Sequence, residues 1–214
     1  MLSQVAEAAR VRALVPTVLT FAPHPRQFFA ELNRRPELSP PQINGLRDKL
    51  SALRQAGIEQ VVLARFNQDF AEMSAEDFIE KLLVKGLNAR WLIVGEDFRF
   101  GRQRSGDVTL LKKMGLQLGL EVHTLSEVKD LNDHRVSSSE VRAALATGDL
   151  TQAQSLLGRP YTMTGHVVHG KKLGRTLSMP TLNMRVTPRC AARSGIYVVR
   201  VHGLAPQALS GVAS

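Results

Sequence analysis

The pattern of apolar and polar residues changes character about two thirds of the way along the chain. In the first part, apolar runs at 17–21, 58–66, 89–95 and 121–125 alternate with amphipathic stretches at 1–16, 41–57, 74–88 and 108–119. The runs predict strands and the stretches predict helices. Apolar strands separated by helices favour a parallel sheet covered on both faces. We therefore expect a Rossmann-like α/β domain here.

The last part of the chain has a different pattern. A helical stretch over 137–158 ends at Arg159-Pro160, and β-branched, glycine-rich segments follow at 164–170, 181–186 and 195–203. Such segments, bounded by turn residues, predict strands. We therefore expect two domains, an α/β domain over residues 1–157 and an all-β domain over 158–214.

Composition and charge narrow the classes of protein and partner. Nothing in the sequence resembles a signal peptide or an apolar run of the roughly 18 residues that a membrane span needs, and Cys190 is the single cysteine. This favours a soluble, cytoplasmic protein without a membrane partner. From Leu150 onward there are eight Lys and Arg residues and no Asp or Glu. Such a polycation favours anionic partners, either nucleotide phosphates or nucleic acid.

Ligands of parallel sheets bind in the loops that follow the strands. The loop after 89–95 contains Asp97, Phe98 and Phe100 together with Arg99 and Arg102. Rings can stack on a planar ligand, the carboxylate can accept ring N–H bonds and the guanidiniums can meet phosphate, which suits an aromatic, phosphorylated ligand. The alternative places both phenylalanines in the core beside solvated arginines, and the sequence does not choose between them.

The loop after 17–21, Ala22-Pro23-His24-Pro25, holds an imidazole between two prolines. It fits a site residue or a rigid, solvated turn.

A candidate phosphate site lies at the start of the 137–158 helical stretch. Free backbone N–H groups and the helix dipole favour an anion there, and Ser138, Ser139 and Arg142 add side-chain donors. Ser137 and Glu140 also have the spacing of a capping box, which would explain these residue types without a ligand.

A second candidate lies in the β domain. Gly165, Gly170 and Gly174 permit close backbone approach, and Arg175 with two lysines supplies positive charge. Thr181 and Asn183, two apart on a strand, present oxygen ligands suited to Mg²⁺ that carries a nucleotide's phosphates. His166 and His169 alone do not make a zinc site.

Four segments in order, TFAPHP, VGEDFRFGRQRSGD, VSSSEVR and GHVVHGKKLGRTLSMPTLN, resemble the bacterial bifunctional riboflavin kinase/FMN adenylyltransferase (FAD synthetase) family. The resemblance implies that the α/β domain transfers AMP from ATP to FMN. It also implies that a partial β-barrel kinase domain phosphorylates riboflavin with ATP and Mg²⁺.

The resemblance also implies roles for single residues. Flavin would contact Asp97, Phe98 and Phe100. ATP would be held by Ser138, Ser139, Arg142, Gly174, Arg175, Thr181 and Asn183, and Mg²⁺ by Thr181 and Asn183.

The chain also departs from the family pattern. Ala22 stands where the family usually has Glu, and SMPTLN replaces a GFPTAN-like run. The family's first strand with its His-x-Gly-His motif is missing, as are later kinase strands with a catalytic Glu. We therefore expect a chain truncated at both ends, with weak or no activity.

Two alternatives compete with flavin synthesis. Another small-molecule adenylyltransferase would leave the β domain unexplained. A basic nucleic-acid-binding module would need aromatic residues for stacking, and only Tyr161 and Tyr197 are available in the β domain. We therefore expect ATP, riboflavin and FMN as partners, and no nucleic acid.

Overall fold

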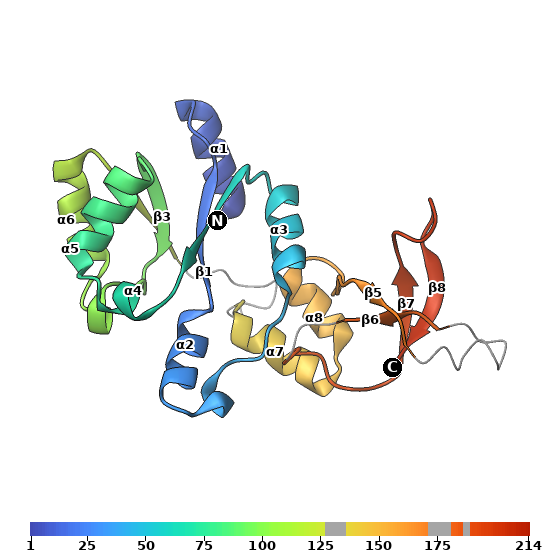
Figure 1. The fold of residues 1–214 in the computed structure, drawn as a ribbon. Coiled ribbons are helices and arrows are strands. Elements are labelled where there is room, and N and C mark those ends of the chain that lie inside the picture. The colour runs from blue at the N-terminus through green and yellow to red at the C-terminus, as the bar shows by residue number, and fades with distance from the viewer. Residues whose placement is uncertain (127–135, 171–180, 186–188) are drawn as a thin grey trace. The chain divides into compact units, whose positions relative to one another are not determined.

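The computed structural model describes residues 1–126, 136–170, 181–185 and 189–214. The chain divides into two compact units (Figure 1). Unit 1 comprises Met1–Pro40 and Leu46–Arg135, and unit 2 comprises Pro41–Gly45 and Val136–Ser214. In the parts of the chain that the structure describes, every helix is too short or too polar to cross a membrane.

Unit 1 contains two pairs of parallel strands. β1 (Thr17–Ala22) pairs with β2 (Gln60–Arg65), and β3 (Trp91–Gly95) pairs with β4 (Glu121–Leu125), both in parallel. In each pair the first residues lie opposite one another, so that the carboxyl ends of the two strands coincide. An α/β architecture with parallel strands is thereby confirmed.

Helices connect these strands along the chain. They are α1 (Leu2–Arg12), α2 (Pro25–Leu32), α3 (Leu46–Gln55), α4 (Gln68–Glu72), α5 (Ala75–Asp77), the π-helix η2 (Phe78–Gly86) and α6 (Val108–Leu118), with short 3-10 turns η1 (Pro36–Leu38) and η3 (Arg102–Arg104). Ser74 and Asp107 cap α5 and α6 by accepting hydrogen bonds from backbone N–H groups three residues later. Gly119 ends α6 in the left-handed conformation. The helices predicted over 74–88 and 108–119 are therefore present with close to the expected bounds.

The core of unit 1 packs the helices around 75–86 and α6 against β3. Ile79 and Leu111 are fully buried, and Leu83, Val94 and Leu120 are nearly so. These positions are the apolar ones of the predicted helices and strands. The hydrophobic pattern thus places this core, which in turn holds the loop after β3.

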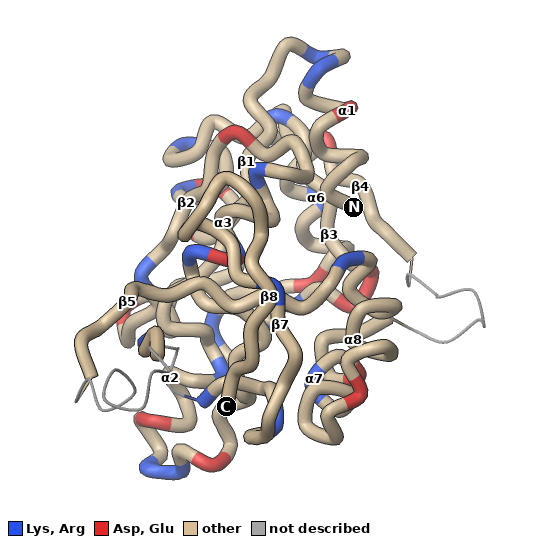
Figure 2. Tube along the Cα trace, turned by 90° about the vertical axis from the view of Figure 1, so that its right-hand side faces the viewer, with Lys and Arg blue, Asp and Glu red and all other residues tan. Residues whose placement is uncertain are grey.

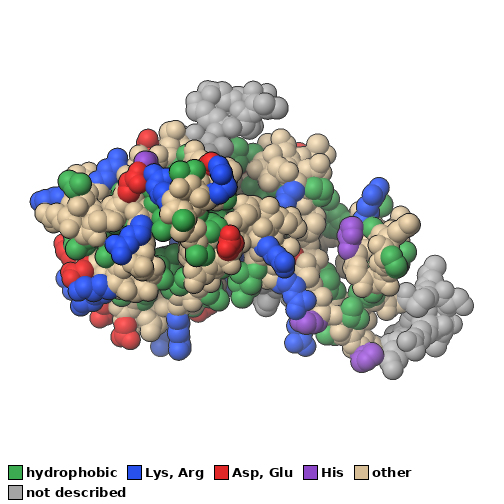
Figure 3. Space-filling model, turned by 90° about the horizontal axis from the view of Figure 1, so that it is seen from above, with side chains coloured by type: hydrophobic (Ala, Val, Ile, Leu, Met, Phe, Trp, Pro, Cys, Tyr) green, Lys and Arg blue, Asp and Glu red, His purple; other side chains and the backbone are tan. Residues whose placement is uncertain are grey.

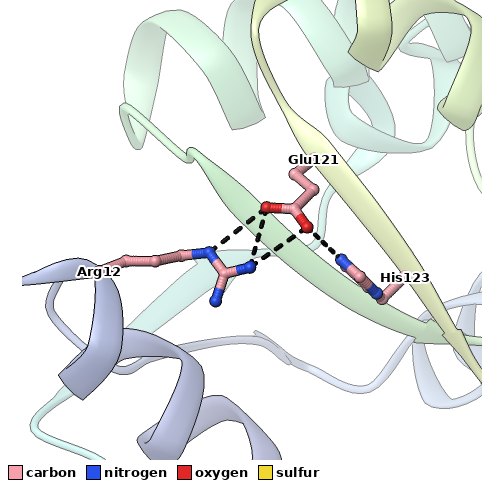
Figure 4. A network of polar contacts seen from close by, with 3 residues as sticks. All are labelled: Arg12, Glu121 and His123. Carbon is pink, nitrogen blue, oxygen red and sulfur yellow. Dashed lines mark hydrogen bonds and ion pairs between the residues drawn. The ribbon is translucent and has the colours of Figure 1, made fainter.

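A polar network ties α1 to the amino ends of β3 and β4 (Figure 4). Arg12 donates to both carboxylate oxygens of Glu121 at 3.1–3.3 Å, and Nε2 of His123 lies 2.6 Å from Oε1 of the same carboxylate. The hydrogen bond from His123 lowers the pKa of Glu121 below its ordinary value; burial opposes this shift, and the hydrogen bond and charge of Arg12 lower the pKa further. Trp91 stacks on His123 with ring centroids 5.1 Å apart. This network holds α1 against the amino ends of β3 and β4, opposite the loops that follow their carboxyl ends.

Unit 2 consists of two helices followed by two antiparallel strand pairs. The helices are α7 (Ser138–Thr147) and α8 (Leu150–Leu157), and the strands are β5 (Val167–Val168), β6 (Asn183–Met184), β7 (Tyr197–Val201) and β8 (Leu209–Ala213). β5 pairs with β6 and β7 pairs with β8, as two separate ladders among the described residues. No Asp or Glu occurs in β5, β6, β7 or β8, and Figure 2 shows β5, β7 and β8 without acidic positions.

The helical stretch predicted over 137–158 forms two helices in the structure. Gly148 takes a left-handed φ of 84° that ends α7, and Asp149 caps α8 by accepting from Gln152 N at 2.8 Å. The break allows α7 and α8 to fold back on one another and bury Leu145 and Ala153 completely. The core of unit 2 is therefore helical.

The β7–β8 ladder leaves apolar side chains on the surface. Val198 and Val212 lie opposite one another in the ladder and are 90% and 73% exposed. Exposed hydrophobic side chains are also visible among basic ones on the face drawn in Figure 3. The strand pattern was predicted from β-branched residues, but these two contribute little to the packed core.

Candidate functional site

All eight phenylalanines of the chain form one continuous series of ring contacts in unit 1. Neighbouring ring centroids lie 5.0–6.4 Å apart, in the order Phe29, Phe28, Phe66, Phe21, Phe70, Phe78, Phe100, Phe98. We call this series the phenylalanine cluster. Aromatic pairs at such separations stabilise one another beyond the area they bury.

The cluster joins the carboxyl ends of three strands. Phe21 lies near the end of β1, Phe66 directly follows β2, and Phe98 lies in the loop after β3. Sequence analysis found only Phe98 and Phe100 of this set. A signal for the others was present, because Phe21 and Phe66 also stand at strand ends, where ligands of parallel sheets bind.

The loop after β3 brings Asp97 and Phe98 to the surface side of the cluster. Phe98 N donates to Gly95 O at 3.1 Å, which turns the chain sharply after the strand. Asp97 is exposed. Its Oδ1 lies close to Gly95, because a Cβ added to Gly95 would be 3.0 Å from this oxygen. The carboxylate is thus folded over the strand end, and Phe98 is half-buried beside it.

Phe100 occupies a different environment. It is 6% exposed, and its ring packs between those of Phe78 at 5.0 Å and Phe98 at 5.4 Å. A ring buried to this extent offers no free face to a ligand. Phe100 therefore lies in the core, which one of the two interpretations of the sequence predicted. Its ring packs against that of Phe98.

His24 begins a helix rather than a turn. Its Nδ1 accepts from Arg26 N at 3.2 Å and caps α2, with Pro25 in the first helical position. The sequence left open a site residue or a rigid, solvated turn, and it did not indicate a helix start because histidine is not among the preferred capping residues. The imidazole is exposed at the carboxyl end of β1.

The first turn of α7 forms the capping box that the sequence allowed. Ser137 and Glu140 form the capping box, with Glu140 N to Ser137 Oγ at 3.3 Å and Ser137 N to Glu140 Oε2 at 3.2 Å. This leaves Ser138 and Ser139 exposed and outside the box. The capping box therefore explains Ser137 and Glu140, and the two following serines lie beside the positive end of the helix.

Arg142 is held beside that helix end by backbone carbonyls. Its Nε donates to Pro41 O at 2.8 Å and its Nη1 to Ser138 O at 3.1 Å. The guanidinium is therefore kept near the α7 amino terminus, where it adds positive charge to that of the helix dipole.

The β5–β6 pair carries the second candidate. Thr181 and Asn183 are both exposed, and Asn183 opposes Val168 in the ladder. Gly170 leaves the space that the Asn183 amide fills, because a Cβ there would lie 2.4 Å from Nδ2 and 3.5 Å from Oδ1. Gly174 and Arg175 lie outside the described residues.

A shallow hollow in unit 1 lies apart from these residues. It is lined by α1 and by the amino ends of β3 and β4, through Ser3, Gln4, Glu7, Ala8, Val11, Arg12, Trp91 and His123. Because ligands of parallel sheets bind at the opposite, carboxyl ends, we place the candidate site at the phenylalanine cluster and not in this hollow.

Comparison with known proteins covers the whole chain. The model of the FAD synthetase family matches residues 1–140, and that of the riboflavin kinase family matches residues 157–214. A bifunctional riboflavin kinase/FMN adenylyltransferase of Escherichia coli (strain K12) is 40% identical over 214 residues, which is 100% of this chain and 66% of that protein. A protein of the same name from Haemophilus influenzae is 38% identical over 92% of this chain and 62% of its own length. The chain thus spans somewhat less than two thirds of these relatives.

A solved structure shows the same fold. A crystal structure described as a macrolide-efflux protein from Streptococcus pneumoniae superimposes with a TM-score of 0.77 at 29% identity, over 100% of this chain and 67% of that one. The family match over residues 1–140 includes the loop after β3, the phenylalanine cluster and the first residues of α7. The chain belongs to the FAD synthetase family.

Proposed function

We propose that the protein acts in flavin cofactor synthesis in the cytoplasm, adenylylating FMN to FAD and phosphorylating riboflavin to FMN with ATP. The observation that carries the proposal is the match to both families along the chain, together with a phenylalanine cluster at the strand ends of the FAD synthetase part. We assign adenylyl transfer to a domain over residues 1–157 and the kinase reaction to a domain over 158–214. In this proposal the first domain is Rossmann-like and the second is part of a β-barrel.

In adenylyl transfer, a phosphate oxygen of FMN attacks the α-phosphorus of ATP and pyrophosphate leaves. Catalysis of such a step depends on positioning and on stabilising charge on the phosphates. We propose that the flavin ring lies against Phe98 with Asp97 at its edge, and that Phe100 holds Phe98 in place. Phe98 is half-buried and stacked on Phe100 at an interplanar angle of 21°, which presents a supported ring to a planar ligand.

The phosphates of ATP are assigned to the start of α7. Ser138 and Ser139 offer exposed hydroxyl and backbone N–H donors, and Arg142 is fixed beside them by its two bonds to carbonyls. An anion at this helix end would meet the helix dipole and a guanidinium together. Gly174 and Arg175 remain assigned to ATP in the kinase part on the family resemblance alone.

The oxygen atoms of Thr181 and Asn183 suit Mg²⁺. Both side chains are exposed, and Gly170 lies on the Nδ2 side of the Asn183 amide, farther from Oδ1. Hydroxyl and amide oxygens are hard ligands of the kind that Mg²⁺ takes when it also binds phosphates. We propose that these two residues hold Mg²⁺, which neutralises phosphate charge when it is bound with ATP.

Direct assays test the proposed function. We expect the purified chain to bind FMN and ATP, measured by flavin fluorescence anisotropy and by calorimetry. We expect no more than slow formation of FAD from FMN and Mg·ATP, which chromatography measures. Riboflavin phosphorylation should be slow, because no Asp or Glu follows Asp149 and a general base contributes about 10²–10⁴-fold to such rates. Absence of binding of both FMN and ATP would contradict the proposal.

Replacing Gly170 by alanine should weaken Mg·ATP binding in the kinase part. The new Cβ would displace the Asn183 amide, and loss of one charge-assisted contact corresponds to about tenfold in affinity. Calorimetric titration of Mg·ATP measures this directly. Gly195→Ala is a control, since an added Cβ there would meet only the ring of Tyr197 at 3.5 Å, an ordinary contact, and the backbone there is not left-handed. Equal affinities of the Gly170 variant and the parent chain would rule out the positioning role.

A further inference from the structure

A rigid turn with two exposed arginines forms the tip of the loop after β3. Phe100 and Gly106 are bridged by reciprocal backbone hydrogen bonds of 3.2 and 2.9 Å, so that residues 101–105 form the tip between them. Within it, the 3-10 turn η3 carries Arg102, Gln103 and Arg104, all exposed. The base of the tip is thus the same Phe100 that supports Phe98.

The tip is fixed to the helices beneath it. Arg102 N donates to Met73 O at 2.7 Å, and Arg104 N donates to Gly101 O at 3.0 Å. Gly101 packs directly on Ala75, where an added Cβ would lie 2.7 Å from backbone atoms. These contacts hold the backbone from which both arginines project, although their side chains are in solvent. Because the backbone is already held, only the side chains lose freedom when a ligand binds.

The backbone of the tip adopts an uncommon conformation. Gln103 and Arg104 have φ of 54° and 61°, in the left-handed region that side chains other than glycine seldom occupy. Such conformations persist only where surrounding contacts impose them, and they concentrate at ligand sites. Here the preceding residues are held in place, Arg102 by its hydrogen bond to Met73 O and Gly101 by its packing on Ala75.

The charges of Arg102 and Arg104 are not balanced locally. Five cations elsewhere in unit 1 form ion pairs, and in the same loop Arg99 pairs with Asp107 at 3.1 Å. Neither Arg102 nor Arg104 lies within 4.0 Å of a carboxylate among the described residues. The tip therefore presents two uncompensated guanidiniums in the loop after β3, and it begins at Phe100, whose ring packs on that of Phe98.

We propose that Arg102 and Arg104 bind the phosphate of FMN and thereby select the phosphorylated flavin over riboflavin. The inference rests on the proposed function and names the residues that would set its substrate preference. Guanidinium groups match phosphate oxygens in pairs, and a ligand whose ring lies on Phe98 carries its phosphate on a flexible arm several atoms away. The tip is the cationic element that this loop offers to such an arm.

The test compares FMN and riboflavin affinities of two double variants. Arg102→Ala/Arg104→Ala removes the proposed contacts. Arg54→Ala/Arg90→Ala removes the same charge from two exposed residues near the amino ends of β2 and β3. Fluorescence anisotropy of each flavin gives the affinities, and circular dichroism melts show that the variants are folded. Flavin binding by unit 2 contributes equally to the parent and both variants.

We expect the Arg102/Arg104 variant to lose about tenfold or more in FMN affinity, with riboflavin affinity within about twofold of the parent. The Arg54/Arg90 variant should keep both affinities. FMN affinity should also fall with added salt in the parent and less steeply in the Arg102/Arg104 variant. An unchanged FMN affinity in that variant, or an equal loss in the Arg54/Arg90 variant, overturns the inference while the proposed function stands. A parent chain that binds neither flavin overturns both.

Discussion

Replacing Leu145 by alanine should lower the free energy of unfolding of unit 2 by about 2–5 kcal/mol, the usual effect of emptying a buried leucine site. Leu145 is fully buried between α7 and α8, where Val141, Ala153 and Leu156 surround it. Leu145 O also accepts from Arg193 N at 3.0 Å, so the last turn of α7 is tied to the segment before β7. Small alanines nearby cannot fill the space that the substitution leaves.

The unfolding of each unit can be followed by its own aromatic residues. The single tryptophan, Trp91, belongs to unit 1, and both tyrosines, Tyr161 and Tyr197, belong to unit 2. We expect the urea midpoint seen by near-ultraviolet tyrosine signals to fall in the Leu145 variant, and the midpoint seen by tryptophan fluorescence to stay. Val198→Ala, at a side chain 90% exposed, should shift neither by more than about 0.5 kcal/mol. Equal shifts of both signals would mean that the two units do not unfold separately.

The same variant links packing to the site. Ser138, Ser139 and Arg142 occupy the first half of α7, and the helix is held in place by the apolar face that Leu145 anchors. A loosened helix would hold the guanidinium of Arg142 less firmly beside its amino terminus. We therefore expect weaker ATP binding along with the loss of stability.

Most elements of unit 1 follow from hydrophobic periodicity, because its strands and helices bury continuous apolar runs and stripes. β1, β3 and α6 begin and end within a residue or two of their predicted limits. α2 was missed because its cap is His24, which no general capping preference selects. α4 was missed because five residues are too few to display a helical period.

Unit 2 was less predictable. Its helical core could be read from the apolar residues of 137–158, but the break at Gly148 required recognition of a left-handed C-cap followed by the cap Asp149. The β segments were placed correctly in outline, yet β5 and β6 extend over only two residues each. Residue propensity locates such strands but does not determine how many of their residues pair with a neighbouring strand.

The sequence predicted part of the candidate site. Their position after a strand end identified Asp97 and Phe98. The burial of Phe100 depends instead on its contacts with Phe78, far away in the sequence, and with Gly106, nearby, which no local pattern shows. The continuity of the phenylalanine cluster is likewise a tertiary property. Local patterns predict which loop carries chemistry, and packing decides which of its side chains face a ligand.

Gly101 provides the sharpest test of how that loop is held. Its φ is +72°, and an added Cβ would lie 2.7 Å from the N and Cα of Ala75 and 2.9 Å from its Cβ. Because two of these atoms belong to the backbone, the neighbour cannot move aside by changing a rotamer. We expect Gly101→Ala to destabilise unit 1 by about 3 kcal/mol or more, combining a left-handed alanine with a steric clash.

Gly119 supplies a matched control within the same unit. Its φ is +73°, and the nearest atom to an added Cβ is the guanidinium Nη1 of Arg90 at 3.9 Å. Gly119→Ala should therefore cost only about 1–2 kcal/mol, the effect of the left-handed conformation. The difference between the two variants, measured by urea unfolding with Trp91 fluorescence, isolates the contact of Gly101 with Ala75.

The Gly101 variant should also lose FMN binding at temperatures where it remains folded. Displacing residue 101 moves the chain between Phe100 and η3, so that the support of Phe98 and the positions of Arg102 and Arg104 change together. The Gly119 variant should bind FMN like the parent, because α6 ends away from that loop. If both variants lose equal stability and keep FMN affinity, the loop is not held by Ala75 and does not contact the flavin.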